Sequence, residues 1–229
     1  MDPNGYKKDL RNKLSKEQAL MKINTENFFR KTLSFYSYVI IDNPEQFRDK
    51  LFKDWIDLDC LGRIYVAREG VNAQMNVPEQ NWKKFIKSLN QYKELKKIPL
   101  KIAVEDDGKS FYKLTIKVKR QIVADGLPLN EYDVTDVGQH LDAQQWNEAI
   151  DNGAIVVDMR NHYESEIGHF ENAICPQSET FREELPHVKN ILKGQEHKKV
   201  LLYCTGGIRC EKASAYLKPV SYTHLRAHE

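Results

Sequence analysis

The stretch KKVLLYCTGGIRCEKASAYL, residues 198–217, contains the side chains best suited to chemistry. A short apolar run ends in Cys204, a Gly-Gly turn follows, and Arg209 leads into a helical pattern. Gly206 and Gly207 tolerate backbone angles that other residues resist, so the loop can curl and turn several N–H groups inward. The positive end of the following helix and the Arg209 charge add to these groups, which predicts a thiol pKa well below the usual value of about 8.5. We therefore predict that Cys204 is a reactive nucleophile.

Two short, almost wholly apolar runs are expected to hold this loop in a parallel sheet. They are AIVVD at 154–158 and KKVLLY at 198–203. Helical patterns at 143–150 and 179–192 alternate with them. Cys204 would then lie at the carboxyl end of a parallel strand, which is where open α/β sheets bind their ligands.

The preceding part of the chain alternates between strand and helix patterns. The predicted elements are strands at 33–41, 61–67, 71–77 and 98–104 and helices beginning at Pro44 and after Pro78. This strand-helix-strand-strand-helix-strand order predicts an α+β, ferredoxin-like βαββαβ domain. Both helices of that fold pack on one face of the sheet and leave the other face free for a partner.

The formal net charge of +2 hides an uneven distribution. Residues 81–120 hold twelve Lys and Arg against four Asp and Glu, a local net charge of +8, and residues 121–229 sum to −7. The segment KLTIKVKR at 113–120 alternates apolar with basic residues, like a strand with one positive face. These basic side chains form either a solvated lysine-rich surface or contacts to an RNA backbone. The candidate RNA contacts are Lys83, Lys84, Lys87, Lys113, Lys117, Lys119 and Arg120.

Composition divides the chain into segments. The Gly, Pro, Asn and Asp content of residues 122–138 is typical of a connector. The predicted organisation is a polar N-terminal extension at 1–32, a ferredoxin-like domain at 33–121, a linker at 122–138 and a parallel α/β domain at 139–218.

The cysteines favour a reducing compartment. Cys60, Cys175, Cys204 and Cys210 form neither a C-x-x-C pair nor a His/Cys zinc pattern. We therefore expect free thiols, no metal site and no evident cofactor. No run is long and apolar enough for a membrane span, and the N-terminus lacks the apolar core of a secretory signal. These features predict a cytoplasmic protein without a membrane partner and leave its oligomeric state open.

The segment YCTGGIRC resembles the active-site loop of rhodanese-type sulfurtransferases, in which a cysteine heads a C-x4-R loop and carries a persulfide. The similar cysteine phosphatases use a wider C-x5-R loop that fits phosphate. VVDMRNHYESEIGHFENAICP is similar to a second rhodanese segment, in which Asp158 and Arg160 are expected to be structural. The resemblance implies that Cys204 is catalytic and that Cys210 is either a resolving thiol or a small residue packed in the first helical turn. The implied active-site loop consists of Thr205, Gly206, Gly207, Ile208, Arg209 and Cys210.

Longer motifs indicate a narrower family. REGVNAQMNVP, DDGKSFYKL, IVADG, TFREELP and YCTGGIRCEKASAYLK occur in this order, as they do in the bacterial tRNA uridine 5-hydroxylases. This resemblance runs from about residue 33 to 218 and implies an acylphosphatase-like N-terminal module and a rhodanese-like domain at 139–218. It further implies tRNA as the partner and molecular oxygen as co-substrate. The implied reaction converts uridine to 5-hydroxyuridine at wobble position 34, with Cys204 as a persulfide carrier.

The resemblance ends after Lys218. PVSYTHLRAHE is unlike the family, which continues with another strand, a turn, a helix and a cysteine-rich tail. We therefore predict that residues 219–229 are a non-native tail and that the rhodanese-like sheet is incomplete, with an exposed edge. Two alternatives to the hydroxylase remain open: a thiosulfate-type sulfurtransferase that uses a Cys204 persulfide, and an inactive rhodanese-like binding protein.

Overall fold

The structure is a computed structural model that describes residues 10–128, 132–218 and the backbone of 223–227. The chain divides between Ile122 and Val123 into two compact units, each with its own sheet. Within the described part of the chain, none of the helices combines the length and apolarity that crossing a membrane requires.

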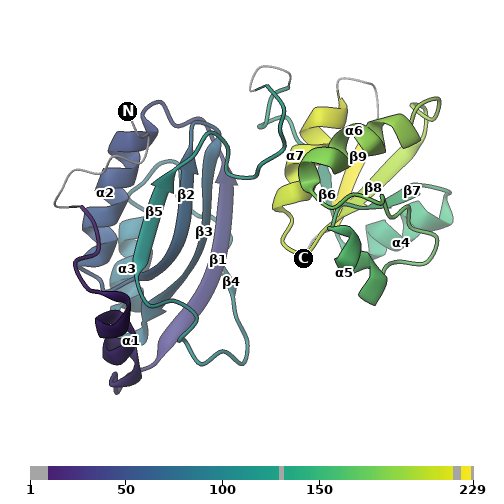
Figure 1. Cartoon of the computed structure of the whole chain (residues 1–229). Coiled ribbons are helices and arrows are strands. Elements are labelled where there is room, and N and C mark those ends of the chain that lie inside the picture. The colour runs from purple at the N-terminus through teal and green to yellow at the C-terminus, as the bar shows by residue number, and fades with distance from the viewer. Residues whose placement is uncertain (1–9, 129–131, 219–222, 228–229) are drawn as a thin grey trace. The chain divides into compact units, whose positions relative to one another are not determined.

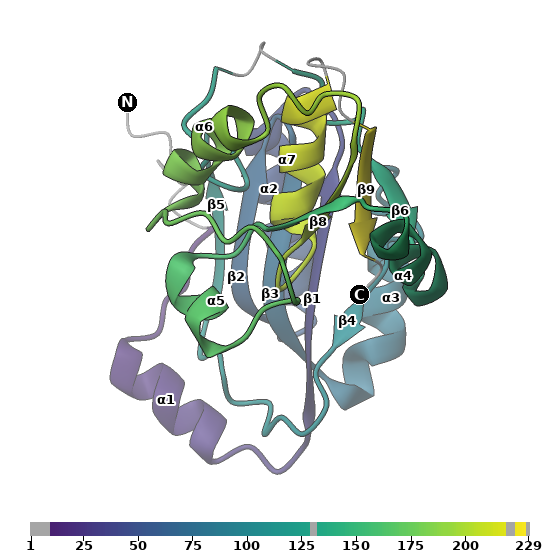
Figure 2. The ribbon, with the colours of Figure 1, turned by 90° about the vertical axis from the view of Figure 1, so that its right-hand side faces the viewer.

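The N-terminal unit has the predicted ferredoxin-like order with one helix before it and one strand after it. Its elements are α1 (Lys16–Asn24), β1 (Arg30–Tyr38), α2 (Pro44–Ile56), β2 (Leu61–Ala67), β3 (Gly70–Pro78), the 3-10 turn η1 (Glu79–Asn81), α3 (Trp82–Leu89), β4 (Lys101–Ile102) and β5 (Leu114–Val118). The strands lie in the order β4-β1-β3-β2-β5, and Figure 2 shows this sheet face on. All neighbouring strands are antiparallel except β2 and β5, which are parallel.

Both helices that follow strands β1 and β3 cover the same face of this sheet (Figure 1). Asn43 caps α2 by accepting the Gln46 N–H, and Pro44 occupies the first turn, as the sequence predicts. Trp55 of α2 and Phe85 of α3 are fully buried in one core cluster with the inward side chains of the strands. Among residues 10–122, neither α2 nor α3 covers the other face of the sheet, because both pack on the apolar side.

Two predicted boundaries of this unit are wrong. β1 begins at Arg30, inside the predicted extension, because the Arg30 guanidinium is buried against Glu26 and Asp59 at 2.7 and 2.6 Å. A pattern of polar residues cannot reveal such a buried ion-pair cluster. The strand predicted at 98–104 is only two residues long, and Val104 is 87% exposed. Alternation shows which side chains are apolar, but it does not fix how many residues pair with the neighbouring strand.

The C-terminal unit is a parallel α/β domain. Its elements are β6 (Gln139–Leu141), α4 (Ala143–Asp151), β7 (Ile155–Asp158), α5 (His162–Ile167), α6 (Phe181–Ile191), β8 (Lys199–Tyr203), α7 (Ile208–Leu217) and β9 (Thr223–Ala227). The strand order is β6-β9-β8-β7, and all three pairings are parallel. Together with the ferredoxin-like unit, this confirms the predicted fold class.

Alternate residues of β8 point to two different cores, so the sheet is covered on both faces. Val200 and Leu202 pack with α6 and α7, and Leu201 and Tyr203 pack with Trp146 of α4. The buried apolar strand that the sequence predicts is therefore the centre of a three-layer domain.

The predicted linker is partly packed into this domain. Val123 and Leu127 lie against the core formed with α6 and α7, and Asp125 is fully buried. The reason is an ion pair between Asp125 and Lys212 of α7, 2.7 Å long. Turn-forming composition predicts a loop here but gives no sign that the loop is anchored.

The expectation that a missing strand leaves an exposed edge in this sheet is also wrong. Residues 223–227 form β9 between β8 and β6, with Leu201 opposite Leu225 and Leu141 opposite Ala227. β8 and β6 each offer an edge of backbone N–H and C=O groups, and pairing with those groups depends little on side-chain identity. The remainder of the predicted tail, 219–222 and 228–229, lies outside the described residues.

Candidate active site

Cys204 follows β8 directly and lies four residues before the start of α7. It continues the alternation of Val200 and Leu202, so its side chain faces α6 and α7 and is 6% exposed. The sulfur is thus at the carboxyl end of a parallel strand, where the sequence predicts it.

The loop turns at Gly207. This residue is the N-cap of α7 and has φ 73°, in the left-handed region that favours glycine. Gly206 has no such angle, and a β-carbon there would meet nothing within 4 Å. The expectation that both glycines are needed for their backbone angles is therefore correct only for Gly207.

The surroundings of Cys204 favour its thiolate. The pKa of Cys204 falls to about 6, chiefly because the Cys210 thiol donates a hydrogen bond to it. Burial opposes this shift, while the N–H of Cys210, the Arg209 charge and the N–H of Gly206 add to it. The inward-facing N–H groups and the cation that the sequence predicts are both present. Cys204 is therefore largely ionised at neutral pH.

This geometry predicts an alkylation profile. The reaction of Cys204 with iodoacetamide should reach half its maximal rate near pH 6 and stay constant above pH 8, because only the thiolate reacts. Arg209→Gln should move the midpoint upward, since it removes a charge that stabilises the thiolate. Mass spectrometry of the Cys204 peptide measures both curves. A wild-type midpoint at pH 8 or above would contradict the proposed stabilisation of the thiolate by these groups.

Arg209 is shared between the sulfur and Glu164 of α5, a residue that sequence reasoning missed. The Arg209 guanidinium donates to both Glu164 oxygens, at 3.0 and 3.4 Å. The Thr205 hydroxyl donates to the same carboxylate at 2.5 Å. Burial alone would raise the pKa of Glu164, but the Arg209 and Thr205 hydrogen bonds outweigh it and lower that pKa. The carboxylate therefore orients the arginine and ties the loop to α5. The spacing of Asn161 and Glu164, which form a capping box, was the available signal.

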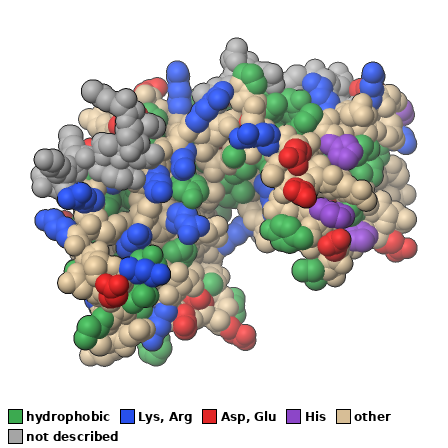
Figure 3. Space-filling view, viewed as in Figure 1, with side chains coloured by type: hydrophobic (Ala, Val, Ile, Leu, Met, Phe, Trp, Pro, Cys, Tyr) green, Lys and Arg blue, Asp and Glu red, His purple; other side chains and the backbone are tan. Residues whose placement is uncertain are grey.

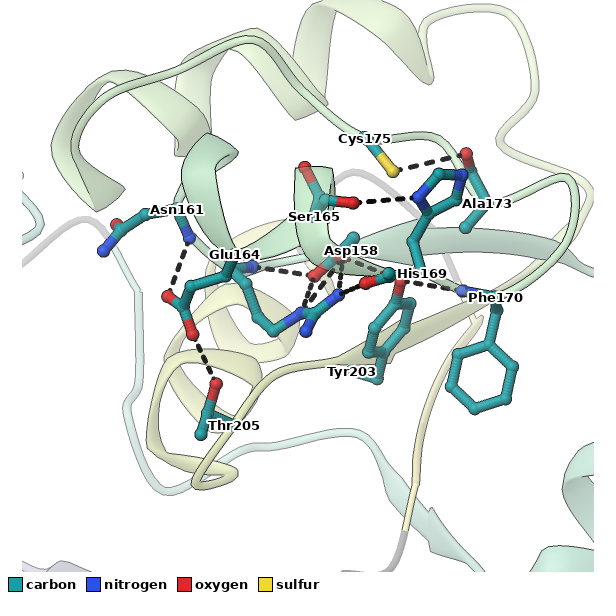
Figure 4. A network of polar contacts seen from close by, with 12 residues as sticks. Asp158, Asn161, Glu164, Ser165, His169, Phe170, Ala173, Cys175, Tyr203 and Thr205 are labelled. Atoms are coloured by element: carbon teal, nitrogen blue, oxygen red, sulfur yellow. Dashed lines mark hydrogen bonds and ion pairs between the residues drawn. The ribbon is translucent and has the colours of Figure 1, made fainter.

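Asp158 is the centre of a second network (Figure 4). The Arg160 guanidinium donates to both Asp158 oxygens and to the Gly168 carbonyl, at 2.5 Å for the last bond. The Tyr203 hydroxyl donates to Asp158 at 2.7 Å and accepts the Phe170 N–H at 3.3 Å. These bonds fix the loop at 168–170 to strands β7 and β8, which agrees with the structural roles expected for Asp158 and Arg160.

Glu184 of α6 is a second residue that sequence reasoning missed. Its side chain is 1% exposed, and neither carboxylate oxygen has a hydrogen-bond partner among the residues that the structure describes. Burial raises the pKa of Glu184 to about 9, and the negative charge of Cys204 adds to this shift, although the nearby Arg209 opposes it. At neutral pH the group is therefore a neutral carboxylic acid beside the active-site loop.

The burial of Glu184 predicts a pH-dependent loss of stability. The folded state keeps the proton up to about pH 9, whereas the unfolded chain releases it near its ordinary pKa of 4.5, so stability falls as pH rises between these values. Glu184→Gln removes this titration and should stabilise the protein by about 4 kcal/mol more at pH 8 than at pH 5. Urea unfolding at the two pH values measures the difference. The exposed Glu183→Gln on the same helix should show no pH-dependent gain, and equal curves for both variants would refute the prediction.

A pocket of about 430 Å³ lies at this end of β8, and Cys204 is one of the residues that line it. It is lined by Arg160, Gly168, His169, Phe170, Tyr203, Cys204 and Thr205. Its volume lies in the range of about 300–1,000 Å³ that is usual for small-molecule sites. Cys204 therefore borders a space that can take a small ligand, although little of its surface is exposed.

The seven candidate RNA contacts do not form one surface. Lys and Arg side chains gather over the N-terminal unit in Figure 3. Lys83, Lys84 and Lys87 are exposed on α3, on the helix-covered side of the sheet. Lys113, Lys117, Lys119 and Arg120 are exposed on and beside β5. Since Leu114 and Ile116 of β5 point into the core under the helices, the odd-numbered lysines point to the open face.

The remaining cysteines are free and lie outside the loop. Cys60 is buried in the N-terminal core, and burial raises the pKa of both Cys60 and Cys175. Among the described residues, no group of three or more His, Cys, Asp or Glu side chains is arranged to hold a metal ion.

Comparison with known proteins decides the family. The model for the UPF0176 acylphosphatase-like domain matches residues 30–122, and the model for the rhodanese-like domain matches residues 142–228. A tRNA uridine(34) hydroxylase from Leptospira interrogans serovar Lai is 55% identical over 94% of this chain and 59% of that protein. The chain is a homologue of the tRNA uridine(34) hydroxylases. This confirms the resemblance that the sequence motifs indicate.

Other relatives agree with this assignment. The tRNA uridine(34) hydroxylase of Hamiltonella defensa is 50% identical over 91% of this chain and 59% of that protein. That of Yersinia enterocolitica is 46% identical over 91% and 60%. The chain therefore spans about three fifths of the length of the curated relatives that it matches. The crystal structure of reduced Bacillus anthracis CoADR-RHD aligns with 93% of this chain and 35% of its own, at a TM-score of 0.38 and 11% identity, which is too distant to support an argument.

Proposed function

We propose that this protein hydroxylates uridine 34 of tRNA at C5, with Cys204 as its sulfur nucleophile. The observation that carries the proposal is the Cys204 thiolate, with its pKa near 6, at the end of a pocket in a chain 45–55% identical to proteins named for this reaction. The substrate and the hydroxylation come from those names. Position C5 and molecular oxygen as co-substrate come from the family resemblance of the sequence motifs.

The overall conversion replaces the C5–H bond of uracil by C5–OH. One atom of O₂ ends on C5, and the other leaves as water with two electrons and two protons from an external reductant. A sulfur nucleophile at Cys204, either the thiolate or its persulfide, would add to C6 of the ring and make C5 electron-rich enough to react with an oxygen species. Loss of the C5 proton and departure of the sulfur from C6 would then restore the C5–C6 double bond and free the nucleophile. The wobble base can leave its stack at low cost because it lies in a single-stranded loop.

The open sheet face beside β5 is the better candidate for the tRNA backbone. Lys119 lies over the Tyr65 ring at 5.4 Å, and Lys113 lies over the Tyr112 ring at the same distance. Basic groups paired with aromatic rings on a sheet suit both phosphates and unstacked bases. Among the described residues, no aromatic ring lies under the exposed lysines of α3. We therefore assign these lysines to the solvated surface.

Nucleoside mass spectrometry tests the proposal. The purified chain is incubated with unmodified tRNA, a reductant and ¹⁸O₂, and the tRNA is digested. We expect 5-hydroxyuridine that carries one ¹⁸O atom. Complete absence of this nucleoside with folded protein would overturn the proposal.

A thiosulfate-type sulfurtransferase is the second candidate. It is favoured by the C-x4-R loop, which needs only the C-terminal unit. Transfer of sulfur from thiosulfate to cyanide without 5-hydroxyuridine formation would support this candidate. Absence of both activities would favour the third alternative, an inactive rhodanese-like binding protein.

A further inference from the structure

Phe170 is an exposed aromatic side chain in the wall of the pocket that Cys204 also lines. It is 45% exposed, whereas its aromatic neighbours Trp146 and Tyr203 are 4% and 8% exposed. An apolar ring of this size costs free energy when it is left in water. Its place beside Cys204 in the pocket wall therefore suggests that a ligand covers it.

Two aromatic neighbours hold the Phe170 ring in place. It packs edge to face on Tyr203, with ring centroids 4.8 Å apart, and lies 5.7 Å from the Trp146 ring. These contacts use one side of the ring and restrict its rotation. In Figure 4 the ring points away from the polar network around Asp158.

The backbone that carries Phe170 is fixed as well. The Phe170 N–H donates to the Tyr203 hydroxyl, and Arg160 holds the neighbouring Gly168 carbonyl. Arg160 and Tyr203 both donate hydrogen bonds to Asp158, so a single buried carboxylate anchors the segment at two points. Phe170 is consequently a preorganised surface in the wall of this pocket rather than a loosely placed side chain.

From this geometry we propose that Phe170 is the stacking platform for the pyrimidine base that reacts at Cys204. The inference rests on the proposed function and identifies the residue that binds the base. A planar ring stacked on Phe170 is kept in the pocket with one face available to the nucleophile. Stacking would also compensate part of the cost of taking the base out of the anticodon stack.

The test compares Phe170→Ala with Phe170→Trp and with Tyr163→Ala. Tyr163 is 62% exposed and does not line the pocket, so it is a matched aromatic control. Phe170→Ala should lower kcat/KM for tRNA hydroxylation about 5- to 150-fold, since stacking on an aromatic ring contributes about 1–3 kcal/mol per base. Phe170→Trp should stay within about 3-fold of wild type, and Tyr163→Ala should be unchanged.

A second readout does not require hydroxylation. An anticodon stem-loop RNA with uridine at position 34 should protect Cys204 from iodoacetamide, and Phe170→Ala should need at least about 5-fold more RNA for the same protection. The alkylation rate without RNA should be equal in both proteins, which separates base binding from a structural effect on the loop. If wild type is protected but makes no 5-hydroxyuridine, the proposed function fails and the platform stands. If Phe170→Ala matches wild type in both assays, or if Phe170→Trp behaves like Phe170→Ala, the platform is refuted.

Discussion

Cys204→Ser is expected to abolish 5-hydroxyuridine formation, with a loss of at least about 1,000-fold in rate. The thiolate is stabilised by the Cys210 thiol, by two N–H groups and by Arg209, and its pKa is about 6. A serine hydroxyl in the same surroundings would stay protonated at neutral pH. Its oxygen also cannot carry a persulfide. Both forms of the proposed sulfur nucleophile are lost, while the substitution changes side-chain size little.

The measurement is ¹⁸O incorporation into tRNA by purified Cys204→Ser, with thermal unfolding as a check on the fold. Cys175→Ser is the matched control, because Cys175 is a half-buried free thiol that does not line the pocket. We expect it to keep wild-type activity. If the Cys204→Ser protein retains a tenth or more of the wild-type rate, the sulfur is not required for the reaction.

Lys212→Met is expected to destabilise the C-terminal unit by about 3–5 kcal/mol. Lys212 and Asp125 are both fully buried, and the ammonium group donates to Asp125 at 2.7 Å and to the Val123 carbonyl at 2.9 Å. Asp125 also accepts the Tyr132 hydroxyl and the Leu127 N–H. Removing the cation leaves a carboxylate in the core without its counter-charge.

Hydrogen exchange of β8 in increasing urea measures this loss. Lys218→Met is the control, since in its ion pair Lys218 is half-buried and Asp136 is exposed, so the pair should contribute less than about 1 kcal/mol. Burial alone would raise the pKa of Asp125, but the Lys212 and Tyr132 hydrogen bonds lower it, so the pair's stabilisation is present above the unfolded pKa and is lost as pH falls through the folded one. The defect of Lys212→Met should therefore shrink in acid, where its Asp125 becomes protonated. A defect that is independent of pH would show that packing, not charge, holds this contact.

The site shows which features can be predicted from local pattern. The position of Cys204 after a buried strand and before a helix follows from periodicity and from the Gly-Gly turn. The proximity of Arg209 and Cys210 follows from loop length, because residues five and six positions away must return to the sulfur when the loop is tight. The sequence does not show that Glu164 and Glu184 lie near Cys204. They are 40 and 20 positions away from it, and only the packing of α5 and α6 brings them to the loop.

The sequence by itself determined the two fold classes, the resemblance to the hydroxylases and the place of Cys204 at the end of a buried strand, since these depend on residue spacing along continuous segments. Only the tertiary structure decided which charges are buried, that Phe170 is left uncovered beside the sulfur, that the candidate lysines lie on opposite faces of a sheet, and that 223–227 pair as a strand. Each of these depends on contacts between segments far apart in the chain. Their free energy comes from burial and desolvation, which a side chain acquires only from its neighbours in space.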